Sequence, residues 1–486
     1  MNKPISFFHA LAFTALALPL AVQAASLQQA DATLKAKATT SLTFKGTGAW
    51  YQFGQAPAPT LAWPKFDVSS YQADINFEKT AGRVQITRKQ SFEPGRNRPA
   101  PTEQKADQYI SDTIAWNLAT TPPANNAPAA TAQPAALEER KAEIISTPQG
   151  FIRAALANNA TSKPTKNGIE VNFTLDKKYQ YKGIINDKNL VESVQTWIDN
   201  PVLGDTLYET TFADYQERSG VQFPARISRK LGGHPILDIS VSEVQPNGNV
   251  SIAVPAEVTA APPAITVTST KLAEGVYYLT GGTHHSVAIE QADHVVLVEA
   301  PQHEARSLAV IAKVKEILPT KPIKYLINTH AHFDHLGGVR TFVDAGATIV
   351  THKDNQAYYQ KIWQQPHSLN PDKLAQSKKT PKFATFSAKH TLGDSTRKIE
   401  LYPLTGNSHN DAFAFIYLPN EKILIEADAY TPLAQGVPVP ANVNPYSQNL
   451  YELIQSQKLD VAQIAALHGP GVVTLADLKT YIGLKS

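Results

Sequence analysis

Apolar and polar residues alternate with a two-residue period along several short segments of the N-terminal half. Segments 70–79 and 82–90 follow this pattern on either side of a short turn, which predicts a β-hairpin. Segment 168–189 repeats the alternation, whereas segment 138–159 has the spacing of a helix, a turn and a second helix. We therefore expect a β-rich N-terminal domain over residues 25–258.

The pattern changes in the C-terminal half. Short apolar runs at 323–329 and 347–352 predict buried strands, and segment 304–318 has the spacing of an amphipathic helix. Strands that alternate with helices predict sheet layers covered by helices. A segment rich in alanine and proline, 259–265, is a plausible linker, so we expect a second domain over residues 266–486.

The composition is that of an ordinary globular protein of 486 residues, with 42% hydrophobic and 18% charged residues. The net charge is only +3 and no basic block is present, so we expect no nucleic-acid partner. The chain contains no cysteine. Disulfides and thiolate zinc sites are therefore excluded, and any metal site must be built from histidine and carboxylate side chains.

Residues 1–24 have the features of a signal peptide. Lys3 is followed by an apolar run and then by small residues that end at Ala24. A short membrane anchor is the alternative, but the run is short for crossing a bilayer. We expect cleavage before Ala25 and an exported protein, periplasmic or secreted. No later segment is apolar enough to predict a transmembrane helix.

The stretch NTHAHFDHLGG, which follows a predicted strand, concentrates metal-binding side chains. It contains His330, His332, Asp334 and His335. Zinc binds imidazole nitrogen and carboxylate oxygen, and a catalytic zinc keeps one position for water. Four such groups exceed what one catalytic zinc needs, which indicates two ions. A polar loop that happens to be rich in histidine is the alternative.

Further candidate ligands stand near the ends of other predicted strands. His409 precedes one strand, Asp428 follows another, and His468 stands before a glycine. Twelve of the 14 histidines lie at or beyond His284. This bias indicates that the metal chemistry belongs to the second domain.

The motif HxHxDH at 330–335, together with these three later residues, resembles the metallo-β-lactamase superfamily over residues 266–486. The resemblance implies an α+β fold, the four-layer αββα sandwich. It also implies a ligand set for two Zn²⁺ ions, although other divalent metals are compatible with these ligands. In that set the first zinc is bound by His330, His332 and His409, the second by Asp334, His335 and His468, and Asp428 bridges both.

Two departures from the family bear on the activity. The zinc β-lactamases that are most similar around His409 have cysteine where this chain has Asp428. The resemblance therefore points towards the lactonase, glyoxalase and phosphodiesterase members. Glu299 stands where the family usually has aspartate, and we expect it to orient the histidine loop.

Four further residues are candidates for supporting roles. Asp334 and Tyr430 are the candidate catalytic residues, and Tyr430 would donate a hydrogen bond to an oxyanion. The alternative for Tyr430 is an aromatic residue that is only partly buried in a loop. Asp411 either orients a ligand histidine or forms a local turn. His284 and His285 either line the mouth of a pocket or lie in a solvated loop.

The resemblance implies an exported dinuclear zinc hydrolase that cleaves a carboxylic ester, lactone or amide by attack of metal-bound hydroxide. A true metallo-β-lactamase and a phosphoester or sulfoester hydrolase are alternatives. The expected substrate is a small molecule of hydrophobic character. Residues 65–250 resemble the half-barrel of outer-membrane lipoprotein carriers. The N-terminal domain is accordingly a lipid- or ligand-binding module or a structural partner, and a binding protein with a structural metal domain is the non-enzymatic alternative.

Overall fold

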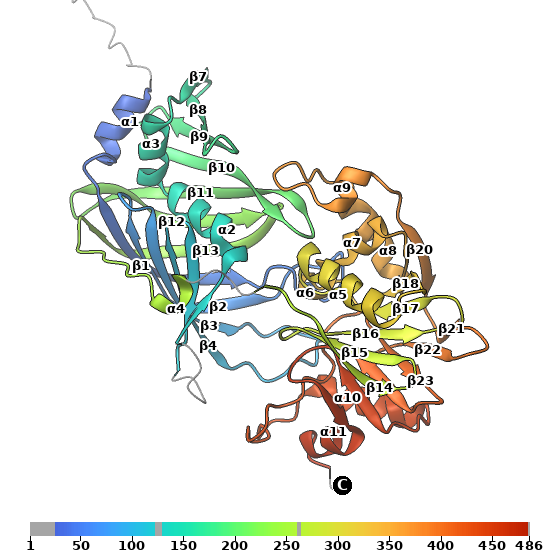
Figure 1. Cartoon of the computed structure of the whole chain (residues 1–486). Helices are drawn as coiled ribbons and strands as arrows, with labels where there is room; N and C mark the ends of the chain where they lie inside the picture. Colours follow the sequence, from blue (N-terminus) through green and yellow to red (C-terminus); the bar gives the residue numbers. More distant parts are fainter. Residues whose placement is uncertain (1–24, 122–128, 260–263, 485–486) are drawn as a thin grey trace, which may run out of the picture.

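The computed structural model describes residues 25–121, 129–259 and 264–484, which form two regions (Figure 1). We call residues 25–259 the N-terminal region and residues 264–484 the C-terminal region. The predicted signal peptide, 1–24, lies outside the described residues.

The N-terminal region is built on one antiparallel sheet of 13 strands, in the order β6-β5-β4-β3-β2-β1-β13-β12-β11-β10-β9-β8-β7. Its strands are β1 (Ser41–Tyr51), β2 (Lys65–Asn76), β3 (Ala81–Gln90), β4 (Glu103–Ser111), β5 (Ile114–Leu118), β6 (Ala130–Ala132), β7 (Thr161–Thr165), β8 (Gly168–Leu175), β9 (Tyr179–Asn186), β10 (Val191–Asn200), β11 (Gly204–Arg218), β12 (Val221–Leu231) and β13 (His234–Pro246). The hairpin predicted from segments 70–79 and 82–90 is confirmed as β2 and β3. β1 and β13 are the first and the last strand of this region in the sequence, and they pair with each other in the middle of the sheet.

Three helices, α1 (Leu27–Leu34), α2 (Leu137–Ile145) and α3 (Pro148–Ala157), pack against this sheet. The predicted helix–turn–helix is confirmed as α2 and α3, and Thr147 caps α3 by accepting a hydrogen bond from the Gly150 amide. Phe151 and Ile152 of α3 are fully buried in a core shared with the strands. The resemblance to a lipoprotein-carrier half-barrel stays a prediction.

The two regions are joined through the predicted linker. A short helix, α4 (Ala256–Thr259), precedes it, and residues 260–263 lie outside the described residues. The exact domain boundaries therefore stay predictions.

The C-terminal region contains two sheets, one of seven strands and one of six, each ordered as in the sequence. The first consists of β14 (Thr268–Ala273), β15 (Val276–Thr280), β16 (Ser286–Glu290), β17 (Val295–Val298), β18 (Ile323–Ile327), β19 (Thr348–His352) and β20 (Lys382–Phe386). The second consists of β21 (His390–Gly393), β22 (Lys398–Pro403), β23 (Ala414–Leu418), β24 (Ile423–Glu426), β25 (Gln463–Ala466) and β26 (Val472–Thr474). The helices are α5 (Glu304–Ile317), α6 (Phe333–Leu336), α7 (Val339–Asp344), α8 (Lys353–Ile362), α9 (Lys373–Ser377), α10 (Pro445–Ser456) and α11 (Leu475–Tyr481).

These elements form four layers. One core joins α5, α7, α8 and α9 to the seven-stranded sheet, and a second core joins both sheets with α10 and α11. Strands β17 to β20 pair in parallel, and the four residues of β17 are completely buried, as expected of a strand covered on both faces. The expected αββα sandwich is therefore confirmed for the C-terminal region.

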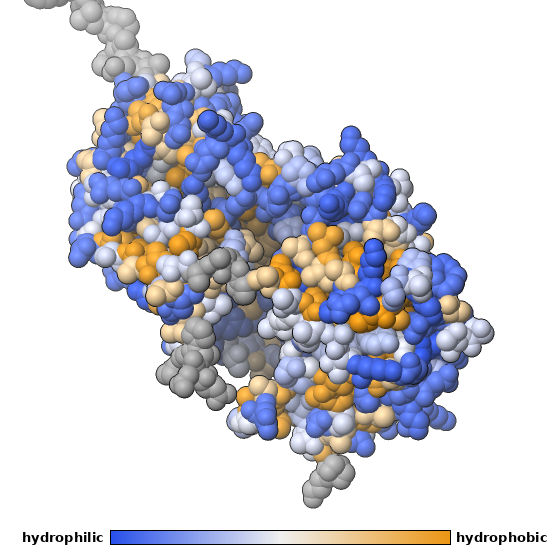
Figure 2. All heavy atoms as spheres, in the orientation of Figure 1, coloured by the Kyte–Doolittle hydropathy of each residue, from blue (hydrophilic) through white to orange (hydrophobic). Residues whose placement is uncertain are grey.

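The surface is hollowed between the two regions on the face shown in Figure 2. Among the described residues, no helix combines the length and the hydrophobicity that crossing a bilayer requires.

Candidate metal centre

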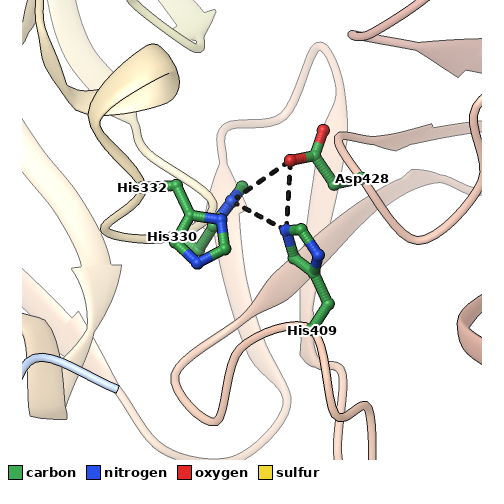
Figure 3. Close-up of side chains that lie close together, drawn as sticks. All are labelled: His330, His332, His409 and Asp428. Atoms are coloured by element: carbon green, nitrogen blue, oxygen red, sulfur yellow. Dashed lines mark hydrogen bonds and ion pairs between the residues drawn. The ribbon is translucent and has the colours of Figure 1, made fainter. Parts of the chain in front are cut away.

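Three loops of the C-terminal region bring a first group of ligands together. His330 and His332 follow β18, His409 lies between β22 and β23, and Asp428 follows β24. Asp428 Oδ2 lies 3.5 Å from His330 Nε2 and 3.1 Å from His409 Nε2, and these two nitrogens are 3.3 Å apart (Figure 3). One ligand atom of each of the four side chains lies within 4.8 Å of all the others. We call these four residues the first cluster.

A second cluster adjoins the first and consists of His284, Asp334 and His335. Asp334 Oδ2 lies 3.2 Å from His284 Nε2 and 3.7 Å from His335 Nε2. His335 Nε2 also lies 3.1 Å from Oδ1 of Asp428. The two carboxylate oxygens of Asp428 therefore face different clusters, which is the arrangement that a bridging ligand requires.

His468 lies at the edge of the second cluster. Its ring centroid is 4.3 Å from that of His284 and 6.3 Å from that of His335. An isolated antiparallel bridge between His284 and His468 connects the two sheets at this point. The structure thus brings all seven predicted ligands into one centre and adds His284, which the predicted ligand set omits. In the sequence, His284 could be noticed because it stands beside a second histidine after a predicted strand.

Buried polar groups fix the orientation of the ligand rings. His335 Nδ1 donates to Glu299 Oε2 over 2.9 Å, and the Glu299 side chain is fully buried. The Nε2 atom of His335 is therefore the one that faces the cluster. Thr329 Oγ1 lies 3.0 Å from His330 Nδ1 and orients that ring in the same way. Glu299 thus contacts a candidate ligand, and its orienting role stays a prediction.

The electrostatics of the centre favour a bound cation. Burial lowers the pKa of His330 to about 4, so its imidazole is neutral and free to ligate at neutral pH. Burial alone would raise the pKa of Asp428, but the neighbouring His335, His330 and His409 hold it well below its ordinary value. Burial likewise opposes ionisation of Asp334, and His335 and His284 nevertheless lower its pKa. The two carboxylates are thus held in their ionised form. Against the effect of burial, Asp428 and Asp334 in turn raise the pKa of His335 well above its ordinary value.

An orphaned atom supports the metal assignment directly. His332 Nδ1 is buried and has no hydrogen-bond partner among the described residues, and His332 is 2% exposed. A buried polar atom without a partner is costly unless something ligates it. The surrounding donor set of imidazoles and carboxylates is the one that zinc accepts. The residues present therefore fit a divalent metal such as zinc.

The centre is reachable from solvent. The side chain of Asp334 is 32% exposed, that of His409 15% and that of Asp428 12%. A small molecule can therefore approach the carboxylates, while the histidines that follow β18 stay buried.

Two predicted supporting residues lie away from the ligands. The ring of Tyr430 packs against Tyr481 at 5.1 Å between centroids, and burial raises its pKa to about 12. The carboxylate of Asp411 forms two hydrogen bonds with Arg96 of the N-terminal region, at 2.9 and 2.8 Å. Neither contact involves a ligand histidine, and the roles of Tyr430 and Asp411 stay predictions. His285 Nε2 donates a hydrogen bond to the Gly469 carbonyl oxygen over 2.7 Å.

Comparisons with known proteins concern the C-terminal region. Residues 279–461 match the family model of the metallo-beta-lactamase superfamily. No curated protein matches the chain.

Among solved structures, a metallo-beta-lactamase from Pontibacter korlensis is 21% identical, with 45% of this chain and 98% of that protein covered and a TM-score of 0.35. A metallo-beta-lactamase from Pseudomonas aeruginosa in its mono-zinc form is 18% identical, with 46% and 96% covered and a TM-score of 0.36. One from Hirschia baltica is 20% identical, with 45% and 96% covered and a TM-score of 0.34. The C-terminal region thus combines a match to the metallo-beta-lactamase superfamily over residues 279–461 with the four-layer αββα sandwich.

Proposed function

We propose that this protein is a dinuclear zinc hydrolase that cleaves a carboxylic ester, lactone or amide bond in a small molecule. The position of Asp428 is the observation that carries the proposal. Its two oxygens contact histidines of two adjacent clusters, at 3.1 Å in each direction. A carboxylate in that position can serve two ions at once, whereas a structural single-metal site does not require the second cluster.

The residues have distinct tasks in such a reaction. His330, His332 and His409 would hold one zinc, Asp334, His335 and His468 would hold the other, and Asp428 would serve both. Zinc supplies a Lewis acid and lowers the pKa of a water molecule to about 7. Water adds to the carbonyl carbon, the bond to the leaving oxygen or nitrogen breaks, and the leaving group takes up a proton. The Asp334 carboxylate is partly exposed, and in our proposal it takes up and returns that proton.

The ligand set indicates the class of substrate. Asp428 offers only oxygen where the similar zinc β-lactamases have a cysteine. This difference favours esters and lactones over β-lactams in our proposal. Phosphoric and sulfuric esters are the second candidate, because paired metals also clamp the oxygens of such groups. Export to the periplasm or the medium, which we also propose, rests on residues 1–24 of the sequence.

The proposal predicts metal-dependent proton release. We expect the purified protein to hydrolyse at least one member of a panel of lactones, carboxylic esters and β-lactams, and thereby to acidify a weakly buffered solution. A chelator should abolish the release, and added zinc should restore it. Turnover of a β-lactam above all lactones and esters would favour the β-lactamase alternative. Release only from phosphate or sulfate esters would favour the second candidate.

A metal-loaded sample that hydrolyses none of these substrates would contradict the proposed activity. A binding function with a structural metal centre would then be the better account. The control is the same panel with heat-denatured protein and zinc, which measures hydrolysis by the free ion.

A further inference from the structure

We infer that a loop of the N-terminal region is part of the metal centre and positions two of its ligands. The loop is Gln52–Pro64, between β1 and β2, and we call it the site loop. Its residues are far from the metal ligands in sequence but contact His332, Asp334 and the loop that carries His409. The inference rests on the metal centre of the proposed function, and it concerns metal binding rather than hydrolysis.

The first contact holds the carboxylate of Asp334. Gln55 Nε2 donates to Asp334 Oδ1 over 2.8 Å, while His284 Nε2 lies 3.2 Å from the other oxygen, Oδ2. The carboxylate is therefore held from both sides. Without Gln55 this partly exposed side chain loses the hydrogen bond that fixes its Oδ1 atom, and Oδ2 is less firmly aimed at the second cluster.

The second contact fixes the tautomer of His332. His332 Nε2 lies 3.0 Å from the backbone carbonyl oxygen of Ala56. A carbonyl oxygen only accepts, so Nε2 must carry the hydrogen. Nδ1 then bears the lone pair, and Nδ1 is the buried atom that lacks a partner. A hydrogen bond that selects the ligating nitrogen is the usual means by which a second residue prepares a metal-binding histidine.

The same carbonyl also reaches the loop that carries His409. Asn410 Nδ2 donates to the Ala56 carbonyl over 3.1 Å, and the Asp411 amide donates to the Pro57 carbonyl over 2.7 Å. The site loop therefore contacts two of the three ligand loops of the first cluster. A displacement of the site loop would disturb the relative position of His332 and His409.

The site loop is held against the C-terminal region by a close approach at Gly54. The Phe333 amide donates to the Gly54 carbonyl over 3.1 Å, and the Phe53 ring packs edge-on against Phe333 at 5.2 Å. Gly54 has φ +77°, and a Cβ atom at this position would lie 2.6 Å from Cγ of Phe333. Since Phe333 lies between His332 and Asp334, a side chain at residue 54 must push the site loop away from both ligands.

These contacts are more specific than ordinary packing between regions. A merely structural interface would affect the free energy of unfolding when altered, and it would leave the metal affinity of the folded protein unchanged. A positioning role affects the metal affinity itself. Loss of a group that supports a metal ligand typically weakens metal binding by about 10- to 100-fold.

The test is zinc affinity, measured on the full protein by competition with a chromophoric chelator. We expect Gly54→Ala to weaken zinc binding by about 10- to 100-fold. Gln55→Ala should weaken the binding of one of the two zinc ions by about 10-fold. Cobalt(II) in place of zinc should show an altered visible absorption spectrum in Gly54→Ala, because His332 is displaced. Circular dichroism identifies any variant that fails to fold, and Gln55→Ala keeps the test valid if Gly54→Ala does not fold.

Two matched controls separate positioning from strain. Gly220→Ala introduces a side chain at a similar φ of +85°, but the nearest atom is Lys35 Nζ at 3.8 Å. Gln104→Ala removes a glutamine side chain of the N-terminal region that, among the described residues, accepts a hydrogen bond from Arg88 alone. Both controls should bind zinc as the parent protein does.

Zinc affinity of folded Gly54→Ala and Gln55→Ala equal to that of the parent protein would overturn the inference. This outcome is distinct from failure of the proposed function. A parent protein that binds two zinc ions but hydrolyses nothing would contradict the proposed function, and a drop in zinc affinity of the two variants would still support the site loop.

Discussion

Replacing Asp428 with asparagine is expected to lower hydrolysis by more than about 100-fold, because loss of a group that only supports a ligand already costs about 10- to 100-fold. Asp428 is itself a ligand in our account, and its two oxygens contact His335 and His409 at 3.1 Å each. Asparagine keeps the shape of the side chain but removes the charge and one oxygen. We therefore also expect the zinc content to fall from two ions per chain towards one.

The measurement is the initial rate of proton release with the best substrate of the panel, together with elemental analysis of zinc. Asp293→Asn is the matched control, because Asp293 is exposed and lies in a separate group with His294 and Asp394. It should leave both rate and zinc content unchanged. An Asp428→Asn protein that keeps two zinc ions and the parent rate would show that Asp428 does not bridge.

Replacing Arg229 with methionine is expected to lower the free energy of unfolding by about 3–5 kcal/mol, the usual cost of leaving one member of a buried ion pair alone. Arg229 of β12 is 5% exposed and forms an ion pair with Glu143 of α2. The hydroxyl of Tyr71 also donates to Glu143, over 2.9 Å. The pair thus connects α2 to β12, and its loss leaves the Glu143 carboxylate, whose side chain is 18% exposed, without its ion-pair partner.

Urea denaturation of the full protein, followed by tryptophan fluorescence, measures this effect. The control is Arg226→Met on the same strand, because the Arg226 side chain is 56% exposed in its ion pair with Asp238. Loss of this exposed pair should lower the free energy of unfolding by less than about 1 kcal/mol. The double variant Arg229→Met with Glu143→Gln should regain much of the loss, since no buried charge then stands alone. Equal destabilisation by the Arg226 and Arg229 variants would contradict the account.

Local patterns were sufficient to predict much of the fold. The alternation at 70–90 predicts the hairpin β2–β3, and the apolar run at 323–329 predicts β18, because each pattern reports directly on burial. The seven candidate ligands could be singled out because each stands in or beside a loop next to an apolar strand, and because their order resembles a known family. The resemblance, rather than any spacing rule, divides these residues between the two ions.

The parts that could not be predicted depend on contacts between distant segments. Gln55 and Ala56 carry no metal-binding motif, and their contacts with Asp334 and His332 arise only when the two regions pack together. The same packing directs Asp411 towards Arg96 rather than towards a histidine. His284 was recognised only as a pocket candidate, since its approach to His468 depends on a bridge between two sheets.

The most direct test of the metal centre is X-ray diffraction at the zinc absorption edge from crystals of the zinc-loaded protein. We predict two anomalous peaks on either side of Asp428, one among His330, His332 and His409 and the other beside Asp334 and His335. The absence of any peak beside Asp428, or a peak only at the separate group of Asp293, His294 and Asp394, would contradict the account.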